Sequence, residues 1–504
     1  MATKLITHWI DGKPDPRAAE RTGDVWNPAT GEVQAKVAFA TPGIVDDAVE
    51  SAWRAARSWC SSSIAKRSKI LFAFRDLVDR HKAELARLLT LEHGKVTADA
   101  MGEVQRGLEV IEFACGIADL AKGEFSENVS TEVDCYSIRQ PLGVVAGITP
   151  FNFPAMVPMW MYPLAIACGN TFVLKPSERD PSAALLCAQL LADAGLPPGV
   201  FNVVHGDKVA VDRILEHPKI AAVSFVGSTP IAQYIYETGT RHGKRVQALG
   251  GAKNHMIVLP DADLELAADA AVSAGYGSAG ERCMAISMVV AVGSAGDRLI
   301  PLMKERIAKL VVGDGLEPAS EMGPLVTRAH LDKVRGYVDR GVAEGASLVA
   351  DGRGLAIAGR PNGFFLGPCL FDRVQPSMAI YKDEIFGPVL GVVRAASYDE
   401  AIALVNRNPY ANGVAIFTND GGAARKFQHE VEVGMVGINV PIPVPMAYYS
   451  FGGWKASLFG DHHIYGRDGV HFYTRTKAVT SRWPDPASRS HGSGGVDLGF
   501  PQNR

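Results

Sequence analysis

Short apolar runs alternate with longer amphipathic segments through the middle of the 504-residue chain. The runs are rich in β-branched residues and cover 141–150, 171–178, 200–206 and 221–229, while residues 230–239 carry a helical pattern. Near-continuous apolar strands that alternate with helices are typical of a parallel sheet covered on both faces. The pattern therefore predicts a doubly wound α/β domain.

The same alternation restarts after residues 254–263. An apolar run at 285–293 predicts a strand, and the apolar residues of 297–313 recur at three- and four-residue steps, which predicts a helix. Strand and helix patterns then continue as far as residue 420. We therefore expect a second α/β domain that begins near residue 251.

Composition and charge exclude several classes of partner. The chain is 47% hydrophobic and 21% charged, which is ordinary for a globular protein, and its net charge of −3 favours neither nucleic acid nor an anionic membrane as a partner. The longest apolar run, residues 153–168, falls short of the roughly 18 residues of a membrane span and contains three prolines. We expect a buried segment there.

The compartment and the metal content follow from a few residue types. The N-terminus lacks the apolar core of a signal peptide, and the seven cysteines have no regular spacing, so we expect a reducing compartment, the cytoplasm. The paired His462 and His463 have no C-x-x-C or H-E-x-x-H motif to accompany them. We therefore expect no metal site.

Two stretches suggest a nucleotide site, although no G-x-G-x-x-G follows a strand. In "FVGSTPIA" (225–232) a strand, a glycine and two hydroxyl residues lead into a helix whose N–H groups could receive a pyrophosphate; the alternative is a plain N-cap by Ser228 or Thr229. In "LKPSE" (174–178) the Glu178 carboxylate could accept from a ribose 2′-hydroxyl and would repel a 2′-phosphate. The alternative there is a solvated Lys/Glu turn.

Cys283, in "SAGERCMA" (278–285), is a candidate nucleophile. Most free cysteines only pack, but Gly277 and Gly280 would allow close approach of a ligand, and Arg282 would favour a thiolate. The asparagine of "PFNFP" (150–154) could donate to a developing oxyanion, although an ordinary proline turn would also explain it.

Together these stretches resemble the aldehyde dehydrogenase family. "PFNFP", "LKPSE", "FVGST", "LGG", the cysteine segment and "EIFGPV" (384–389) occur in the family's order and spacing over about residues 20–483. The resemblance implies that Cys283 attacks an aldehyde, that the Asn152 amide and the Cys283 N–H hold the oxyanion, and that hydride passes to NAD and leaves a thioester. It also implies a set of NAD-binding residues: Thr149, Phe151, Lys175, Glu178, Gly227, Ser228, Glu384 and Phe386.

The chain departs from the family pattern at one informative position. Hydrolytic members have a glutamate in "ELGG" that activates water, whereas this chain has Ala248 in "QALGGAKNH". General-base help is typically worth about 10²–10⁴ in rate, so water should attack the thioester slowly and coenzyme A becomes the expected acceptor. "GAKNH", "ERCMA" and "FYTRTKAVTSRW" (472–483) resemble the CoA-acylating methylmalonate-semialdehyde dehydrogenase subgroup.

The subgroup resemblance implies the substrate and its binding residues. Arg106 and Arg282 match the arginines that hold the substrate carboxylate, and the expected products are propionyl-CoA or acetyl-CoA, CO₂ and NADH. One alternative is a hydrolytic, CoA-independent aldehyde dehydrogenase. Another is a catalytically silent binding protein on the same fold.

The family also implies a domain plan with two Rossmann-like doubly wound domains and a β-hairpin arm that joins subunits into a homo-oligomer, with a tetramer expected. The NAD-binding domain would comprise 1–118 and 142–250, the catalytic domain 251–463, the arm 119–141 and 464–484, and a Ser/Gly/Pro-rich tail 485–504.

Overall fold

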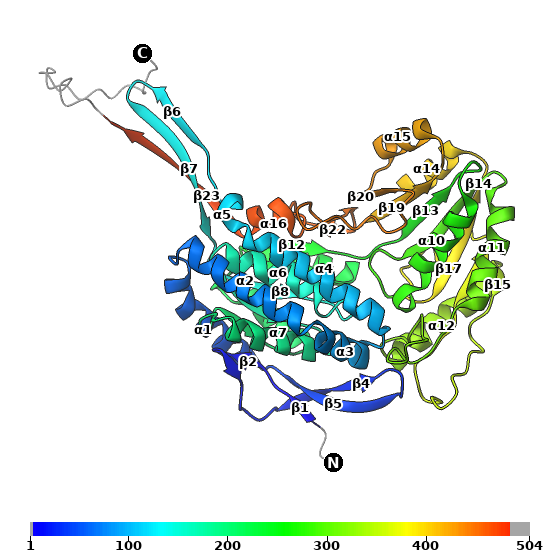
Figure 1. The fold of residues 1–504 in the computed structure, drawn as a ribbon, viewed down its shortest axis with the longest axis horizontal. Coiled ribbons are helices and arrows are strands. Elements are labelled where there is room, and N and C mark those ends of the chain that lie inside the picture. Colours follow the sequence, from blue (N-terminus) through cyan, green and yellow to red (C-terminus); the bar gives the residue numbers. More distant parts are fainter. Residues whose placement is uncertain (1–3, 484–504) are drawn as a thin grey trace, which may run out of the picture.

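The computed structural model describes residues 4–483, so the expected tail at 485–504 lies outside the described residues. Figure 1 shows two bodies, each built around a sheet with helices beside it, and a long ribbon of strands that projects away from them. A small sheet near the N-terminus lies against the first body. It consists of β1 (Lys4–Ile6), β5 (Glu32–Phe39) and β4 (Arg21–Asn27).

The first body contains an eight-stranded sheet. Its central strands are parallel, and the chain begins in the middle of them, runs to one side and then returns to the other, as in a dinucleotide-binding sheet. In spatial order the strands are β22 (Leu458–Phe459), β12 (Arg245–Leu249), β11 (Ile220–Val226), β8 (Val144–Ile148), β9 (Thr171–Lys175), β10 (Phe201–Val203), β2 (Trp9–Ile10) and β3 (Lys13–Pro14).

Helices cover both faces of this sheet, as the apolar strands predict. Alternate strand residues point to opposite sides, so Val144 and Ala146 join one apolar cluster and Val145 joins another. One cluster includes α1 (Pro42–Trp59), α8 (Lys208–Glu216) and α9 (Thr229–Arg241). The other includes α2 (Ile64–Arg80), α3 (Lys82–His93), α4 (Thr97–Cys115), α5 (Ile117–Leu120), α6 (Met156–Ala167) and α7 (Ser182–Asp193).

Every residue of α6 is buried, so the apolar run at 153–168 is a core helix, as expected. Among the described residues no helix has the length and apolar character to cross a membrane.

The second body contains a seven-stranded sheet with six parallel strands and one antiparallel edge strand. In spatial order these are β15 (Ser347–Ala350), β16 (Cys369–Asp372), β17 (Val389–Ala395), β14 (Ile286–Val292), β13 (Asn254–Val258), β19 (Gly413–Phe417) and β20 (Met435–Ile438). Its helices are α10 (Leu264–Tyr276), α11 (Ala295–Lys309), α12 (Arg328–Ala343), α13 (Ala379–Lys382), α14 (Tyr398–Asn406) and α15 (Gly421–Glu430). Two short strands, β18 (Tyr410–Ala411) and β21 (Trp454–Lys455), pair beside it.

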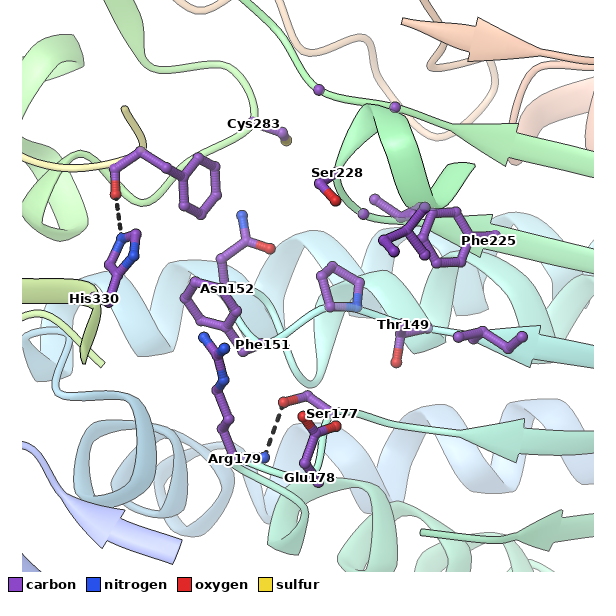
Figure 2. Close-up of a pocket in the computed structure, with 18 of the residues that line it drawn as sticks. Thr149, Phe151, Asn152, Ser177, Glu178, Arg179, Phe225, Ser228, Cys283 and His330 are labelled. Atoms are coloured by element: carbon purple, nitrogen blue, oxygen red, sulfur yellow. Dashed lines mark hydrogen bonds between the residues drawn. The ribbon is translucent and has the colours of Figure 1, made fainter. Parts of the chain in front are cut away.

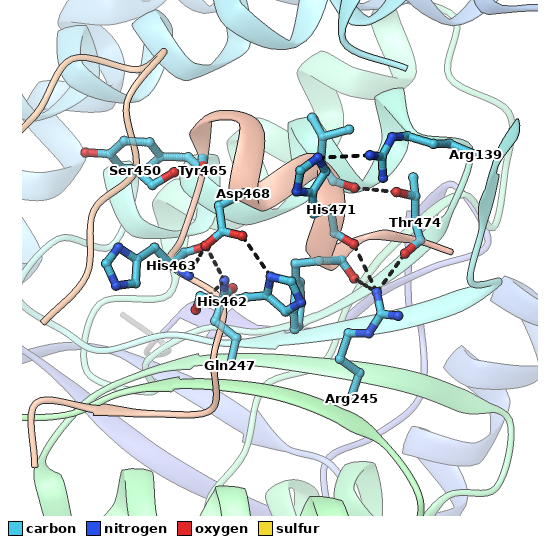
Figure 3. Close-up of polar contacts among 12 residues, drawn as sticks. Arg139, Arg245, Gln247, Ser450, His462, His463, Tyr465, Asp468, His471 and Thr474 are labelled. Atoms are coloured by element: carbon cyan, nitrogen blue, oxygen red, sulfur yellow. Dashed lines mark hydrogen bonds and ion pairs between the residues drawn. The ribbon is translucent and has the colours of Figure 1, made fainter. Parts of the chain in front are cut away.

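The projecting arm is a three-stranded antiparallel sheet in the order β23 (Thr474–Arg482), β7 (Val133–Pro141) and β6 (Phe125–Ser130). A short helix, α16 (Gly466–Phe472), precedes β23 at the arm's base (Figure 3). There the Arg245 guanidinium donates to the carbonyls of Phe472 at 2.6 Å and Thr474 at 2.7 Å, which ties the arm to the edge of the first sheet. Within the part of the expected arm segment that the structure describes, 464–483, a helix therefore precedes the strand.

One pairing crosses the expected domain division. The segment 251–463 was expected to belong to the second domain, yet β22 pairs with Ala248 and Leu249 of the first sheet. The Gln247 amide also links the segment after β22 to the first sheet by donating to the carbonyls of His462 and His463 (Figure 3). A two-residue strand that pairs across more than 200 residues leaves no periodic signal in the sequence.

Candidate active site

A cavity of about 580 Å³ lies at the carboxyl ends of β8, β9 and β11. The chain reverses its direction across the sheet between β8 and β11, and such a switch point is where open α/β sheets bind ligands. The volume lies within the range of about 300–1,000 Å³ that is typical of cofactor sites. Figure 2 shows side chains from several separate segments facing this cavity.

The start of α9 opens into this cavity through Gly227 and Ser228. Ser228 is the N-cap residue, but its side chain makes no capping hydrogen bond. The Thr229 hydroxyl instead accepts from the Gly251 N–H at 2.8 Å and donates to the Ala456 carbonyl at 3.2 Å. The plain N-cap alternative therefore does not describe this turn, and the start of α9, whose second residue is Pro230, lies beside the cavity without a side-chain cap.

Two polar groups at the opposite wall fit a ribose and its neighbours. Lys175 Nζ donates to Glu178 at 3.1 Å, and both residues line the cavity. Burial acts to raise the pKa of Glu178, but the Lys175 charge and hydrogen bonds outweigh burial and lower the pKa, so the carboxylate is an acceptor. The buried Thr149 hydroxyl has no partner within residues 4–483, which leaves it free for a ligand.

Aromatic rings gather near the end of the cavity that holds Cys283. Phe151 packs edge-on against Phe386 with their ring centroids 5.8 Å apart, and Phe386 has a positive φ of 61°. The His330 ring donates from Nε2 to the Phe386 carbonyl at 2.7 Å and so fixes this uncommon backbone (Figure 2). Glu384 accepts from the Ala252 N–H at 2.9 Å.

Sequence reasoning missed several residues that line this cavity. Arg179 lies over the Phe151 ring at 4.9 Å, and its position directly after "LKPSE" was a usable signal. His330 and Lys333 reach the cavity from α12, in the other body. Nothing in their local sequence marks them, because only the packing of the two bodies brings them to the first sheet.

The Cys283 loop lies at the amino end of β14 and is held at its carbonyl. The side-chain amides of Asn254 and Asn412 donate to the Cys283 carbonyl at 2.9 and 3.2 Å. The glycines of this loop allow protein groups to approach closely. A Cβ on Gly277 would lie 2.5 Å from the Arg282 guanidinium, and one on Gly280 would lie 2.3 Å from the Gly387 carbonyl.

Burial raises the pKa of the Cys283 thiol to about 12, and the Glu384 charge adds to the rise. Hydrogen bonds from backbone N–H groups and the Arg282 charge act in the opposite direction but are outweighed. The Arg282 charge therefore lowers the pKa of Cys283, as expected, but by less than burial and the Glu384 charge raise it. One reason is that Arg282 is already paired with Asp99 at 2.6 Å.

Asn152 lies in the turn between β8 and α6, and its side chain extends toward Cys283 (Figure 2). It is almost fully buried, yet within residues 4–483 its amide makes no hydrogen bond to protein. An amide that lines the cavity without a protein partner is available to a ligand, here an oxygen near the Cys283 sulfur.

A second cavity, of about 430 Å³, begins on the other side of Cys283. Cys283 is the one described residue that lines both cavities. Arg106 and Arg282 both line the second cavity, together with the apolar Phe153, Met156 and Trp160. The structure thus places two cations and a thiol around one space. Arg106 is paired with Glu109 at 2.8 Å.

Ala248 lines neither cavity and is fully buried in the apolar cluster under α9. Among residues 4–483, four carboxylates line the two cavities, and each has a partner. The pairs are Glu178 with Lys175, Glu384 with the Ala252 N–H, Asp99 with Arg282, and Glu103 with Lys95. Each of these four carboxylates thus already accepts from a protein group, and the side chain at position 248 adds no carboxylate to either cavity.

No group of three or more potential metal ligands occurs in the part of the chain that the structure describes. The imidazole of His462 instead bonds Asp468 at 2.8 Å (Figure 3).

Comparisons with known proteins agree with this geometry. Residues 16–479 match the aldehyde dehydrogenase family. A malonate-semialdehyde dehydrogenase of Pseudomonas aeruginosa is 59% identical over 469 residues, which is 93% of this chain and 94% of that protein.

Two solved structures extend the comparison. A protein of Sinorhizobium meliloti, crystallised as a complex with NAD, is 54% identical with a TM-score of 0.95 and covers 96% of this chain and 99% of its own. A methylmalonate-semialdehyde dehydrogenase of Oceanimonas doudoroffii is 52% identical with a TM-score of 0.95 and covers 97% and 100%. The expected fold class is confirmed, and the chain belongs to the aldehyde dehydrogenase family.

Proposed function

We propose that this chain is an NAD-dependent, CoA-acylating dehydrogenase of malonate semialdehyde or methylmalonate semialdehyde. The observation that carries the proposal is the position of Cys283, where a dinucleotide-sized cavity meets a second cavity lined by two arginines. The names of the similar proteins give the same substrate class, and one of those proteins was crystallised with NAD.

The proposed cofactor residues all line the first cavity. Bound NAD would supply the hydride acceptor, and the N-terminus of α9 would receive its pyrophosphate. Glu178 would accept from the ribose 2′-hydroxyl, which favours NAD over NADP because a 2′-phosphate would face a carboxylate. The full set is Thr149, Phe151, Lys175, Glu178, Gly227, Ser228, Glu384 and Phe386.

Cys283 is the proposed nucleophile. Its thiolate adds to the aldehyde carbon, and the carbonyl oxygen becomes an oxyanion that the Asn152 amide and the Cys283 backbone N–H would receive. When the carbon loses its hydride, the oxyanion collapses to a carbonyl and a thioester on Cys283 remains.

Arg106 and Arg282 are proposed to hold the substrate carboxylate. Each guanidinium has five N–H donors, so a pairing with Glu109 or Asp99 leaves donors for a second carboxylate. A carboxylate β to a carbonyl can leave as CO₂, because the electron pair of the broken C–C bond moves onto the carbonyl and the carbon then takes a proton. The product acyl group is acetyl or propionyl.

Coenzyme A is the proposed acceptor of that acyl group. Position 248 is alanine, so the side chain that activates water in hydrolytic members of the family is absent, and the described carboxylates that line the two cavities each hold a protein partner. A thiol is a better nucleophile than water and needs less help from a base. The hydrolytic alternative requires another base, and the silent-protein alternative requires an inert Cys283.

NADH formation from malonate semialdehyde and NAD, with and without CoA, tests the proposal. We expect turnover to require CoA and to yield acetyl-CoA, and Cys283→Ala to abolish it. Equal rates with free acid as the product would favour the hydrolytic alternative. Absence of NADH under both conditions would favour the silent protein.

The carboxylate assignment has its own test. Arg106→Met or Arg282→Met should raise KM for malonate semialdehyde about 10- to 100-fold, since a hydrogen bond to a charged group is worth about 1.5–3 kcal/mol. Propanal lacks the carboxylate and serves as the control substrate, whose KM should change little. Equal losses for both aldehydes would contradict the assignment.

We also propose a cytoplasmic location and a homo-oligomer, a tetramer, joined through the arm. All seven cysteines are free thiols, as a reducing compartment favours. Recovery of the protein from an exported cell fraction would contradict the cytoplasmic location.

A further inference from the structure

A fully buried ion pair lies under the turn that carries Asn152. Lys95, between α3 and α4, places its Nζ 2.5 Å from Oε2 of Glu103 in α4, and neither side chain is exposed. Removing two charges from water costs several kcal/mol per ion, so an apolar pair would often stabilise a fold equally well. The pair therefore needs an explanation beyond stability.

The pair holds the Asn152 turn from both ends. Lys95 Nζ also donates to the Asn152 carbonyl at 2.7 Å and lies 4.3 Å from the centroid of the Phe153 ring. Glu103 Oε1 accepts from the N–H groups of Ala155 at 2.8 Å and Met156 at 3.1 Å, where α6 begins. One ion pair thus fixes the peptides on both sides of Phe153.

Asn152 depends on this support because its own amide has no protein partner within residues 4–483. The direction of the side chain is then set by its backbone, and Lys95 holds that backbone. We propose that Lys95 and Glu103 are positioning residues that orient the Asn152 amide toward the oxyanion formed at Cys283. The inference rests on the proposed function of Cys283 and Asn152.

The expected effect is on the transition state. An oxyanion donor acts as charge develops on the oxygen, and a misplacement of about 1 Å can lower the rate about 10²-fold. We expect Lys95→Met to lower kcat for NADH formation about 10²-fold. KM for the semialdehyde should change little, because the arginines that would bind its carboxylate are untouched.

A second variant separates positioning from stability. Lys95→Met leaves the Glu103 charge unpaired and should lower Tm, whereas Lys95→Met with Glu103→Gln removes both charges and should recover most of that Tm. The amide oxygen introduced by Glu103→Gln would still accept from the α6 N–H groups, but nothing would hold the Asn152 carbonyl. We expect the double variant to keep the 10²-fold loss in kcat; recovery of kcat together with Tm would overturn the inference.

Lys244 provides a matched control. It is a buried lysine that donates to the carbonyls of His217 at 2.6 Å and Ile220 at 2.9 Å, and it lines neither cavity. Lys244→Met should lower Tm without changing kcat per folded active site. A loss in kcat as large as that of Lys95→Met would mean that any buried lysine is needed, which contradicts a positioning role.

The circular dichroism signal gives the fraction of folded protein, and the rate of iodoacetamide labelling of the Cys283 peptide shows whether the thiol itself is altered. We expect the Lys95 variants to react at the wild-type rate, since alkylation forms no oxyanion. If the wild-type chain forms no thioester at all, the proposed function fails. If the wild-type chain forms the thioester and the double variant has the same kcat as the wild-type chain, only this inference fails.

Discussion

Among single residues, Cys283 differs from the other cysteines in where it lies rather than in how it titrates. Burial raises the pKa of Cys168, Cys187 and Cys283 alike to about 12. Cys283, however, lines both cavities and faces the Asn152 amide (Figure 2). A raised pKa does not mark a nucleophile in this chain, and the geometry around the sulfur does.

The pH dependence of alkylation tests the state of this thiol. With a pKa of about 12, about one Cys283 in 10⁴ is a thiolate at pH 8 in the free protein. The rate of iodoacetamide labelling, followed by mass spectrometry of the Cys283 peptide, should rise about tenfold per pH unit from pH 7 to 10. A plateau near pH 9, the ordinary range for a cysteine, would contradict the raised pKa.

Some residues that line the first cavity stand in motifs that the sequence shows, and others do not. Lys175, Glu178, Gly227 and Ser228 stand in short motifs at strand ends, and strand ends meet at one edge of a parallel sheet. His330 comes from α12 of the other body, and its hydrogen bond to the Phe386 carbonyl exists only after the two bodies pack. Local pattern carries no information about that packing.

The central strands are the most predictable elements because they are buried on both faces. β8 and β9 are fully buried and read as continuous apolar runs in the sequence. The two-residue strands β2, β3 and β22 are too short to show a period of two, and the partners of β2 in β10 and of β22 in β12 are distant in sequence.

The loop before β14 depends on the absence of a side chain at Gly280. This residue has φ of 73°, and a Cβ there would meet the Gly387 carbonyl at 2.3 Å. We expect Gly280→Ala to lower the free energy of unfolding by more than the roughly 1–2 kcal/mol of left-handed backbone strain and to lower kcat, because Phe386 and Cys283 flank this contact.

Gly243→Ala is the matched control for that substitution. Gly243 has φ of 72°, but a Cβ there would meet nothing within 4 Å. Gly243→Ala should therefore lower the free energy of unfolding in urea only by the backbone strain and leave kcat unchanged. Gly280→Ala should lower the free energy of unfolding further and should also lower kcat. Equal effects of the two substitutions would mean that the contact with Gly387 is unimportant.

In the whole molecule, the arm stands away from both bodies (Figure 1). β7 and β23 pair along nine residues, and the arm exposes Phe125 and Trp483 at 64% and 66% of their surfaces. Exposed aromatic rings on a projecting sheet are typical of an interaction surface, which supports the proposed oligomer.

Light scattering after size-exclusion chromatography tests the assembly. We expect a multiple of the 53.8 kDa chain mass, with four copies as the expected state. Phe125→Ser combined with Trp483→Ser should lower the mass while the circular dichroism spectrum stays unchanged. A monomer mass for the unmodified chain would contradict the oligomer.

We propose that a second thiol, not water, releases the acyl group from Cys283, and intact-mass spectrometry of the protein mixed with malonate semialdehyde and NAD, without CoA, tests this release. We expect an acyl adduct on Cys283 that persists for many minutes and disappears within one mixing time when CoA is added, with acetyl-CoA formed in equal amount. Rapid loss of the adduct in the absence of CoA, with free acid released, would contradict it.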